Sequence, residues 1–196
     1  MKTSNLITFA AAAFLLSGCI PSVNPYYTAK DVVFDPRLLG EWQVKESSQE
    51  PQFWKFEKGD DKAYQLTVIE KGGKEGKFAA HFFKLRQEHF LDLVPSDCDY
   101  AKDQADLVAC SMFPGHLLVR VSQIEPELRL AFFDFDWLEQ FLKENPKAIA
   151  HHTEDKRMLL TASTRDLQRF VLKHLGEQEL FEEPNVMVRK PASATQ

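Results

Sequence analysis

Basic residues, cysteines and long apolar runs are all scarce in this chain of 196 residues. Lys and Arg total 24 against 29 Asp and Glu, so a net charge of −5 leaves no positive surplus for a nucleic acid backbone. The chain also lacks the Gly-x-Ser-x-Gly, phosphate-loop, dinucleotide-binding and His-Glu-x-x-His motifs. These absences predict a protein that is not an enzyme, uses no cofactor and binds no nucleic acid.

Apolar and aromatic side chains, in contrast, are plentiful. They account for 44% and 12% of the residues, and 16 of them are Phe. A chain with so many large rings can bury enough apolar surface to fold, which excludes disorder throughout. Its length fits one globular domain.

The single long apolar run lies at the N-terminus and is too short to cross a membrane. Residues 6–16 follow the basic residue Lys2 and form a run of 11, whereas a membrane-spanning helix needs about 20. We therefore predict an export signal over residues 1–18.

The run ends in Leu16-Ser17-Gly18-Cys19, which resembles the lipobox of bacterial lipoproteins. The resemblance implies a diacylglyceryl group on the Cys19 thiol, cleavage before Cys19 and acylation of the new amine. Ile20 stands where an Asp would mark inner-membrane retention, so the resemblance favours the outer membrane of the cell envelope. The alternative is an ordinary signal peptide followed by a buried cysteine.

Export would place the other two cysteines, Cys98 and Cys110, in an oxidising compartment. We predict a disulfide between them, which on the loop-entropy model stabilises the fold by about 3 kcal/mol. Two free thiols or a metal pair are the alternatives, because a sequence does not give the distance between the two Cα atoms.

Composition divides the mature chain into three parts. Residues 19–36 hold three prolines and few periodic apolar residues, so we expect a lipidated tether there. Residues 37–190 form the predicted single domain, and residues 191–196 a flexible tail.

The domain is predicted to be mainly β with two helices. Alternating apolar residues indicate strands near 40–46, 52–58, 63–70, 76–85, 88–94, 116–124, 127–133 and 156–162. Helices are expected over 134–145 and 163–176, each after a capping residue, and at least one should cover the outer face of the strand near 78–85. Eight strands joined by short turns favour an antiparallel up-and-down barrel, with an open α+β sheet as the alternative.

The first of these strands carries Gly40-Glu41-Trp42, which resembles the Gly-x-Trp motif of lipocalins and related calycins. The resemblance implies that Gly40 permits a close approach of chains. It also implies that Trp42 plugs the closed end of a barrel against a late arginine, either Arg157 or Arg189.

A longer pattern resembles a group of uncharacterised bacterial lipoproteins. It comprises residues 32–36, 39–42, 80–85, 90–93 and 160–164. This resemblance supports a single exported domain and implies no activity.

Candidate site residues are few. The adjacent His151 and His152 would point to opposite faces of a strand, so we expect no metal site. Asp134 and Asp136 precede a helix, where acids act as caps more often than as an acid/base pair. Asp92 lies between Leu91 and Leu93, and its charge should face either water or the barrel interior. If it points inward, it is the first candidate for contact with a ligand.

These features support two hypotheses. The first is a lipid-anchored protein whose barrel binds a small apolar or amphipathic ligand. The second is an envelope assembly or maintenance lipoprotein that holds a protein partner. The interior decides between them, because it is either hollow or filled by side chains such as Trp54, Phe56, Leu66, Val68, Leu130 and Phe132.

Overall fold

The structure is a computed structural model that describes residues 20–45, 52–96, 113–155 and 157–190. Cys19, Cys98 and Cys110 lie outside these ranges, so the expected lipid attachment and disulfide remain predictions.

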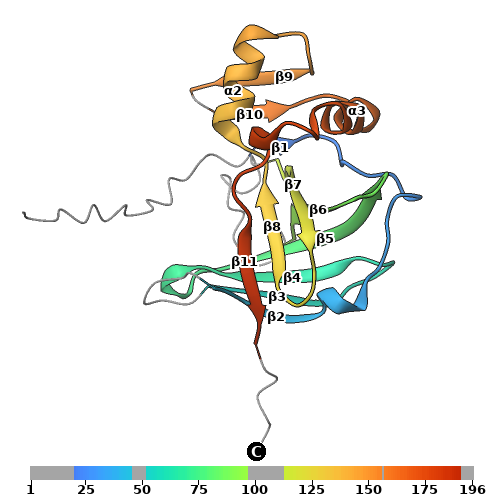
Figure 1. The fold of residues 1–196 in the computed structure, drawn as a ribbon, viewed down its shortest axis with the longest axis vertical. Helices are drawn as coiled ribbons and strands as arrows, with labels where there is room; N and C mark the ends of the chain where they lie inside the picture. The colour runs from blue at the N-terminus through green and yellow to red at the C-terminus, as the bar shows by residue number, and fades with distance from the viewer. Residues whose placement is uncertain (1–19, 46–51, 97–112, 156, 191–196) are drawn as a thin grey trace, which may run out of the picture.

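The fold is a closed antiparallel barrel of eight strands, as predicted (Figure 1). Its strands follow one another around the wall, and pairing of β11 with both β2 and β8 completes the circle. They are β2 (Gly40–Val44), β3 (Phe53–Lys58), β4 (Tyr64–Ile69), β5 (Glu75–Leu85), β6 (Glu88–Pro95), β7 (His116–Gln123), β8 (Leu128–Phe132) and β11 (Asn185–Arg189).

The last strand of the barrel differs from the one expected. The segment predicted near 156–162 does form a strand, β10 (Arg157–Leu160), but it pairs outside the barrel with β9 (His151–Glu154) and β1 (Pro21–Ser22). The eighth barrel strand is β11, in which Met187 is the one fully buried residue. A strand with a single buried position carries almost no alternating pattern, which is why the sequence did not reveal it.

Apolar side chains from all eight strands meet inside the barrel. The fully buried rings and chains of this inner core include Trp42, Phe56, Tyr64, Leu66, Leu91, Val119, Leu130 and Met187. The alternation along each strand puts every second residue into this core and its neighbours onto the outer face.

Two helices lie between β8 and β11. The described residues also form three short 3-10 helices: η1 (Pro36–Leu38), η2 (Lys71–Gly73) and, between the second of the two helices and β11, η3 (Gln178–Leu180). α2 (Phe135–Glu144) begins where Asp134 accepts a hydrogen bond from the backbone N–H of Trp137, at 2.7 Å. α3 (Thr164–His174) begins where the Ser163 hydroxyl accepts from the N–H of Asp166, at 3.3 Å. Both cap predictions are therefore confirmed.

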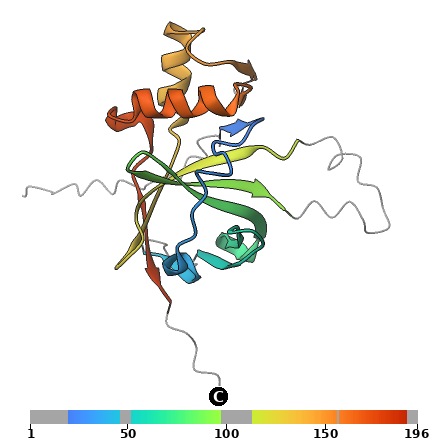
Figure 2. The same cartoon turned by 90° about the vertical axis from the view of Figure 1, so that its right-hand side faces the viewer.

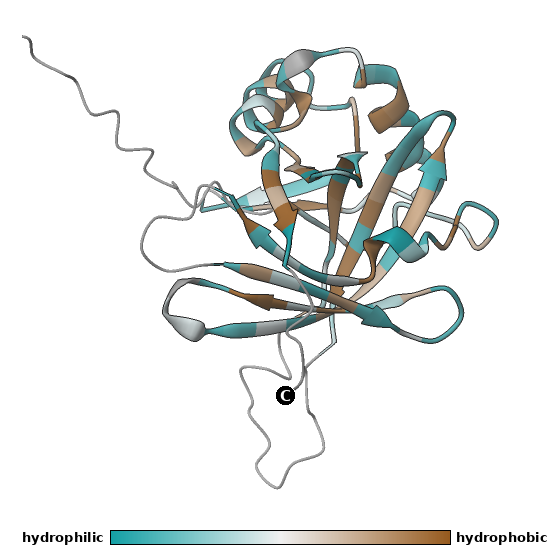
Figure 3. Cartoon of the chain, turned by 60° about the horizontal axis from the view of Figure 1, so that its bottom comes forward, coloured by the Kyte–Doolittle hydropathy of each residue, from teal (hydrophilic) through white to brown (hydrophobic). Residues whose placement is uncertain are grey.

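The two helices cover part of the barrel from outside (Figure 2). A second core forms between them and the wall, where Phe83, Leu85 and Phe90 of β5 and β6 belong to the same cluster as Leu138 and Phe170 of the helices. Residues of β5 are thus buried on both faces, as the apolar run near 78–85 predicted. Figure 3 shows the resulting brown, apolar bands along the strands.

The prediction of a tether over residues 19–36 is wrong for the part that the structure describes. Ile20, Ser22 and Tyr26 are at most 4% exposed, and β1 pairs with both β7 and β10. Further along, Val32 forms a β-bridge with Phe83. Pro21 lies in β1 between β7 and β10, so this part of the segment is an inner strand of the sheet.

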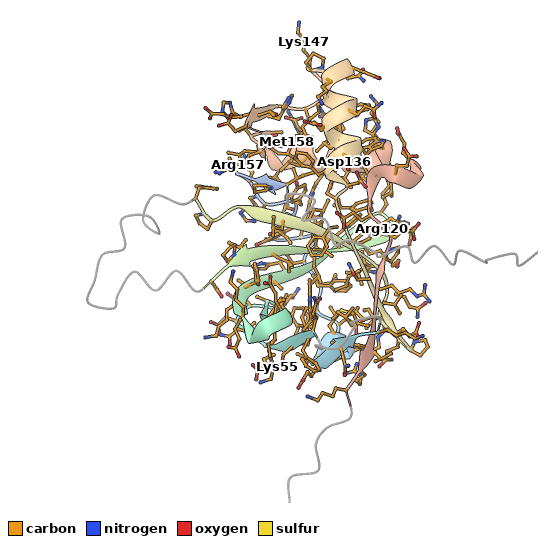
Figure 4. All side chains as sticks on the ribbon, turned by 90° about the vertical axis from the view of Figure 1, so that its left-hand side faces the viewer. Lys55, Arg120, Asp136, Lys147, Arg157 and Met158 are labelled. Carbon is orange, nitrogen blue, oxygen red and sulfur yellow. The ribbon has the colours of Figure 1, made fainter. Side chains whose placement is uncertain are left out.

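One end of the barrel is closed around Trp42. Its indole is fully buried and donates from Nε1 to the carbonyl of Leu38, at 2.9 Å. The guanidinium of Arg189 lies 4.2 Å from the centre of the Trp42 ring and donates to the carbonyl of Leu39, at 2.6 Å. Arg189 is therefore the late arginine, whereas Arg157 lies exposed on β10 (Figure 4).

Gly40 is required at this end for two reasons. Its φ of +115° is one that residues with a side chain rarely adopt, and a Cβ there would lie 2.8 Å from Nη1 of Arg189. The motif resemblance thus pointed to a real close approach.

Gly40→Ala should destabilise the fold by about 2–4 kcal/mol, because it adds backbone strain and displaces Arg189 from Trp42. Urea unfolding followed by tryptophan fluorescence measures this. Gly176→Ala is the matched control, since nothing lies within 4 Å of a Cβ at that position. Equal unfolding midpoints for the two variants would contradict the role of Gly40.

Candidate functional site

The outer face of the barrel carries a buried polar cluster centred on Asp92 of β6. Residues 90–93 are all buried, with Leu91 and Leu93 in the inner core and Phe90 in the outer one. Asp92 alternates with Leu91 and Leu93 and so lies on the outer face, fully buried beneath the N-terminal segment. Both expected orientations, toward water and toward the interior, are therefore wrong.

Two donors satisfy the Asp92 carboxylate. The backbone N–H of Tyr26 donates to Oδ2 at 2.9 Å, and Nδ1 of His116 lies 2.7 Å from Oδ1. A carboxylate removed from water is tolerated only with such partners, because its desolvation costs several kcal/mol. Asp92 thus fastens the N-terminal segment to β6 and β7.

A second histidine completes the cluster. His81 of β5 lies directly opposite Asp92 in the register, and its ring stacks on Tyr27 with centroids 4.6 Å apart. Burial lowers the pKa of His81, although the charge of Asp92 opposes this shift. Nδ1 of His81 is buried without a hydrogen-bond partner among the described residues.

The nearby hydroxyl groups are not presented to a substrate. Ser22 is fully buried, and its hydroxyl donates to the carbonyl of Asn24. Burial raises the pKa of the Tyr26 phenol, and the charge of Asp92 adds to the rise. The arrangement therefore serves to hold two segments together, and its geometry offers no exposed nucleophile.

Side chains fill the barrel interior. Phe56, Leu66 and Leu130 are at most 1% exposed, and Trp54 lies edge-on to Phe132 with ring centres 6.1 Å apart. All six residues that the sequence singled out as possible interior filling belong to or pack against the inner core.

Three of the hollows described for the placed part of the chain lie outside that core, and the lining of the fourth includes Tyr64 and Leu66 of the core. The widest, about 690 Å³, follows β4 and β5 and is lined largely by outward residues such as Gln65, Lys77 and His81. Another, about 400 Å³, lies beside Trp137 and Phe141 of α2. Two more, of about 320 and 490 Å³, flank α3.

The remaining predicted site residues are scattered. Gly40 and Trp42 lie together at the closed end, far in sequence from Arg189 but in contact with it. His151 and His152 lie on β9, where Nδ1 of His151 contacts the carbonyl of Ile149 at 2.9 Å. Over residues 20–45, 52–96, 113–155 and 157–190, no three or more His, Cys, Asp or Glu side chains form a group that could hold a metal ion.

Sequence reasoning missed the partners of Asp92. Tyr26 is 66 positions away and His116 is 24 away, and no motif links them. The one available signal was the charge itself, since an acid within an apolar strand needs donors from elsewhere. The ligand contact predicted for Asp92 rested on an inward orientation that the structure does not have.

Comparisons with family models, with curated proteins and with solved structures find no match. None of the described helices is both long enough and apolar enough to span a bilayer.

Asp92→Ala should cost about 3 kcal/mol of stability, because it leaves the backbone N–H of Tyr26 and the partly buried imidazole of His116 without their acceptor. Urea unfolding gives the loss, and faster hydrogen exchange at the Tyr26 amide would locate it. Glu88→Ala, on the same strand and face, removes a half-exposed ion pair with Arg120 and should cost less than about 1 kcal/mol. Similar losses in both variants would show that Asp92 does not act as a fastening point.

Proposed function

We propose that this chain is an N-terminally lipidated protein of the bacterial cell envelope with a non-catalytic binding role, held at the outer membrane. The export signal over residues 1–18 and the Leu16-Ser17-Gly18-Cys19 pattern support the lipid attachment. Two or three acyl chains, at about 0.8 kcal/mol per buried methylene, would hold the protein permanently.

The fold adds a consequence to this proposal. Ile20 is only 4% exposed and Pro21 already pairs with β7, so the folded body begins directly after Cys19. Lipid on Cys19 would hold the barrel against the bilayer with no spacer between them.

Within this role, we infer that the barrel is a solid scaffold that binds an envelope protein partner through its outer surface. The observation that carries this choice is the packed interior, in which Phe56, Leu66 and Leu130 are at most 1% exposed. Small eight-stranded barrels are often filled in this way. The described hollows on the outer surface are compatible with such a use.

A second candidate is a small apolar or amphipathic ligand at the end of the barrel away from Leu38. Trp54, Val68, Phe78 and Phe132 pack against the inner core there and remain partly exposed. These four partly exposed side chains suit an apolar group that does not enter the barrel deeply.

Cys19→Ala tests the lipid attachment. The variant should accumulate as an uncut precursor or in the wrong compartment, because the thiol that receives the glyceride is gone. Intact mass spectrometry and membrane fractionation of the native and variant chains provide the measurement. A variant that remains in the membrane fraction at the mature size would contradict lipidation.

Native mass spectrometry of the chain extracted from its own membrane separates the two binding candidates. If the barrel is packed, the spectrum should show the mass of the lipidated chain with no additional small molecule. A bound compound that disappears in Phe132→Arg, but stays in the outward-facing control Phe53→Arg, would favour the ligand candidate. Chemical crosslinking in whole cells should then yield an adduct with an envelope protein if the scaffold proposal holds.

A further inference from the structure

A hollow of about 320 Å³ separates α3 from the segment 147–150, outside the barrel and away from Asp92. Its apolar part consists of Ile149, Ala162 and Phe170, each at most 5% exposed. Cationic side chains border it from the helix and from the segment. The volume is at the lower end for small-molecule sites, which suits a head group and a short apolar portion.

His174 lines this hollow and has an unsatisfied nitrogen. The residue is 5% exposed, and its Nδ1 lies 2.7 Å from Oε1 of Glu177. Its Nε2 is buried and has no hydrogen-bond partner among the described residues. A buried ring nitrogen without a partner costs about 1–3 kcal/mol, so such atoms are rare outside places where a ligand or water completes them.

Aromatic rings hold the imidazole of His174 in place. Phe170, Phe141 and Trp137 surround it, with ring centres 4.6, 4.7 and 5.8 Å from its own. Because these contacts and Glu177 fix the ring of His174, its Nε2 holds one position and is shielded from solvent.

The lining of the hollow has three cations, Lys147, Arg169 and Lys173, against one carboxylate, Asp166. Lys147 and Lys173 are exposed and have no ion pair within the described part of the chain, while Arg169 pairs with Asp166 at 2.9 Å. The adjoining hollow of about 490 Å³ adds Arg86 and Arg165. In a chain with a net charge of −5, this concentration of cations around α3 attracts anions locally.

We propose that this hollow binds an anionic amphiphile through a phosphate or carboxylate group. Lys147 and Lys173 bind the anionic group at the border, and Nε2 of His174 donates to it from within, while Nδ1 faces Glu177. A short apolar chain rests on Ile149, Ala162 and Phe170. Asn24 donates to the carbonyl of Ala162 at 2.9 Å, so the hollow adjoins the segment that follows Cys19.

The amphiphile comes either from solution or from the bilayer, and the shared chemistry is the anionic head group. The proposal does not depend on lipidation of Cys19, so a negative result here and a negative result for Cys19→Ala are separate findings.

The test follows the histidine ring ¹⁵N signals of the full chain in nonionic detergent during titration with hexyl phosphate and with inorganic phosphate. We expect hexyl phosphate to shift the His174 signals in a saturable way and to bind more tightly than inorganic phosphate. Lys173→Glu should weaken hexyl phosphate binding by about tenfold or more. The matched control Lys143→Glu, on the exposed face of α2, should change it less than about twofold.

His174→Gln should abolish the binding of hexyl phosphate, as measured by calorimetry. The control His152→Gln, at an exposed histidine, should leave this binding unchanged. No saturable shift up to about 10 mM hexyl phosphate, or equal weakening by the two lysine variants, would overturn the proposal. If inorganic phosphate and hexyl phosphate bind equally well, the apolar chain contributes nothing to binding, and the assignment to an amphiphile is overturned. In lipid nanodiscs, a His174 shift with phosphatidylglycerol but not with phosphatidylcholine identifies a bilayer lipid as the source, whereas a shift only with hexyl phosphate identifies a soluble one.

Discussion

The pairing of β11 with β2 makes the barrel possible, and the contact between Arg189 and Trp42 seals it. Without this pairing, β2 and β11 would each expose a row of unpaired backbone groups, which invites association with other chains. Arg189 lies over the Trp42 ring and bonds the carbonyl groups beside η1, so one side chain joins the last strand, the first strand and the helix that closes the end. The chain between β8 and β11, which includes both helices, leaves the barrel wall after β8 and comes back to it at β11.

The connection between β8 and β11 and the N-terminal segment pack on the outer face of the barrel wall and form a second core there. β5 and β6 are buried on both faces, which is uncommon for an antiparallel sheet and explains their unusually apolar sequence. Asp92 is the polar exception within that layer. Its carboxylate contacts the backbone N–H of Tyr26 and the imidazole of His116, and so fixes where the N-terminal segment crosses the wall.

The inner core and the outer core both bear on where a partner could bind. Because side chains occupy the interior, the proposed partner would bind to surfaces around the barrel. The cationic region at α3 adjoins the N-terminal segment, since Asn24 of that segment donates to the carbonyl of Ala162 beside the hollow. An anchor at Cys19 and a head-group site beside α3 would therefore place one side of the protein at the lipid surface.

The sequence alone determined the features that depend on near neighbours. Alternation gave most of the strands, capping residues gave both helices, and Gly40 with Trp42 marked the closed end, because each of these signals acts within a few residues. Only the tertiary structure decided the features that depend on which distant segments meet. It selected Arg189 over Arg157, assigned the eighth place in the barrel to β11, and packed residues 20–36 onto the wall. It also brought Tyr26 and His116 to Asp92, since a buried charge requires donors but does not specify where along the chain they lie.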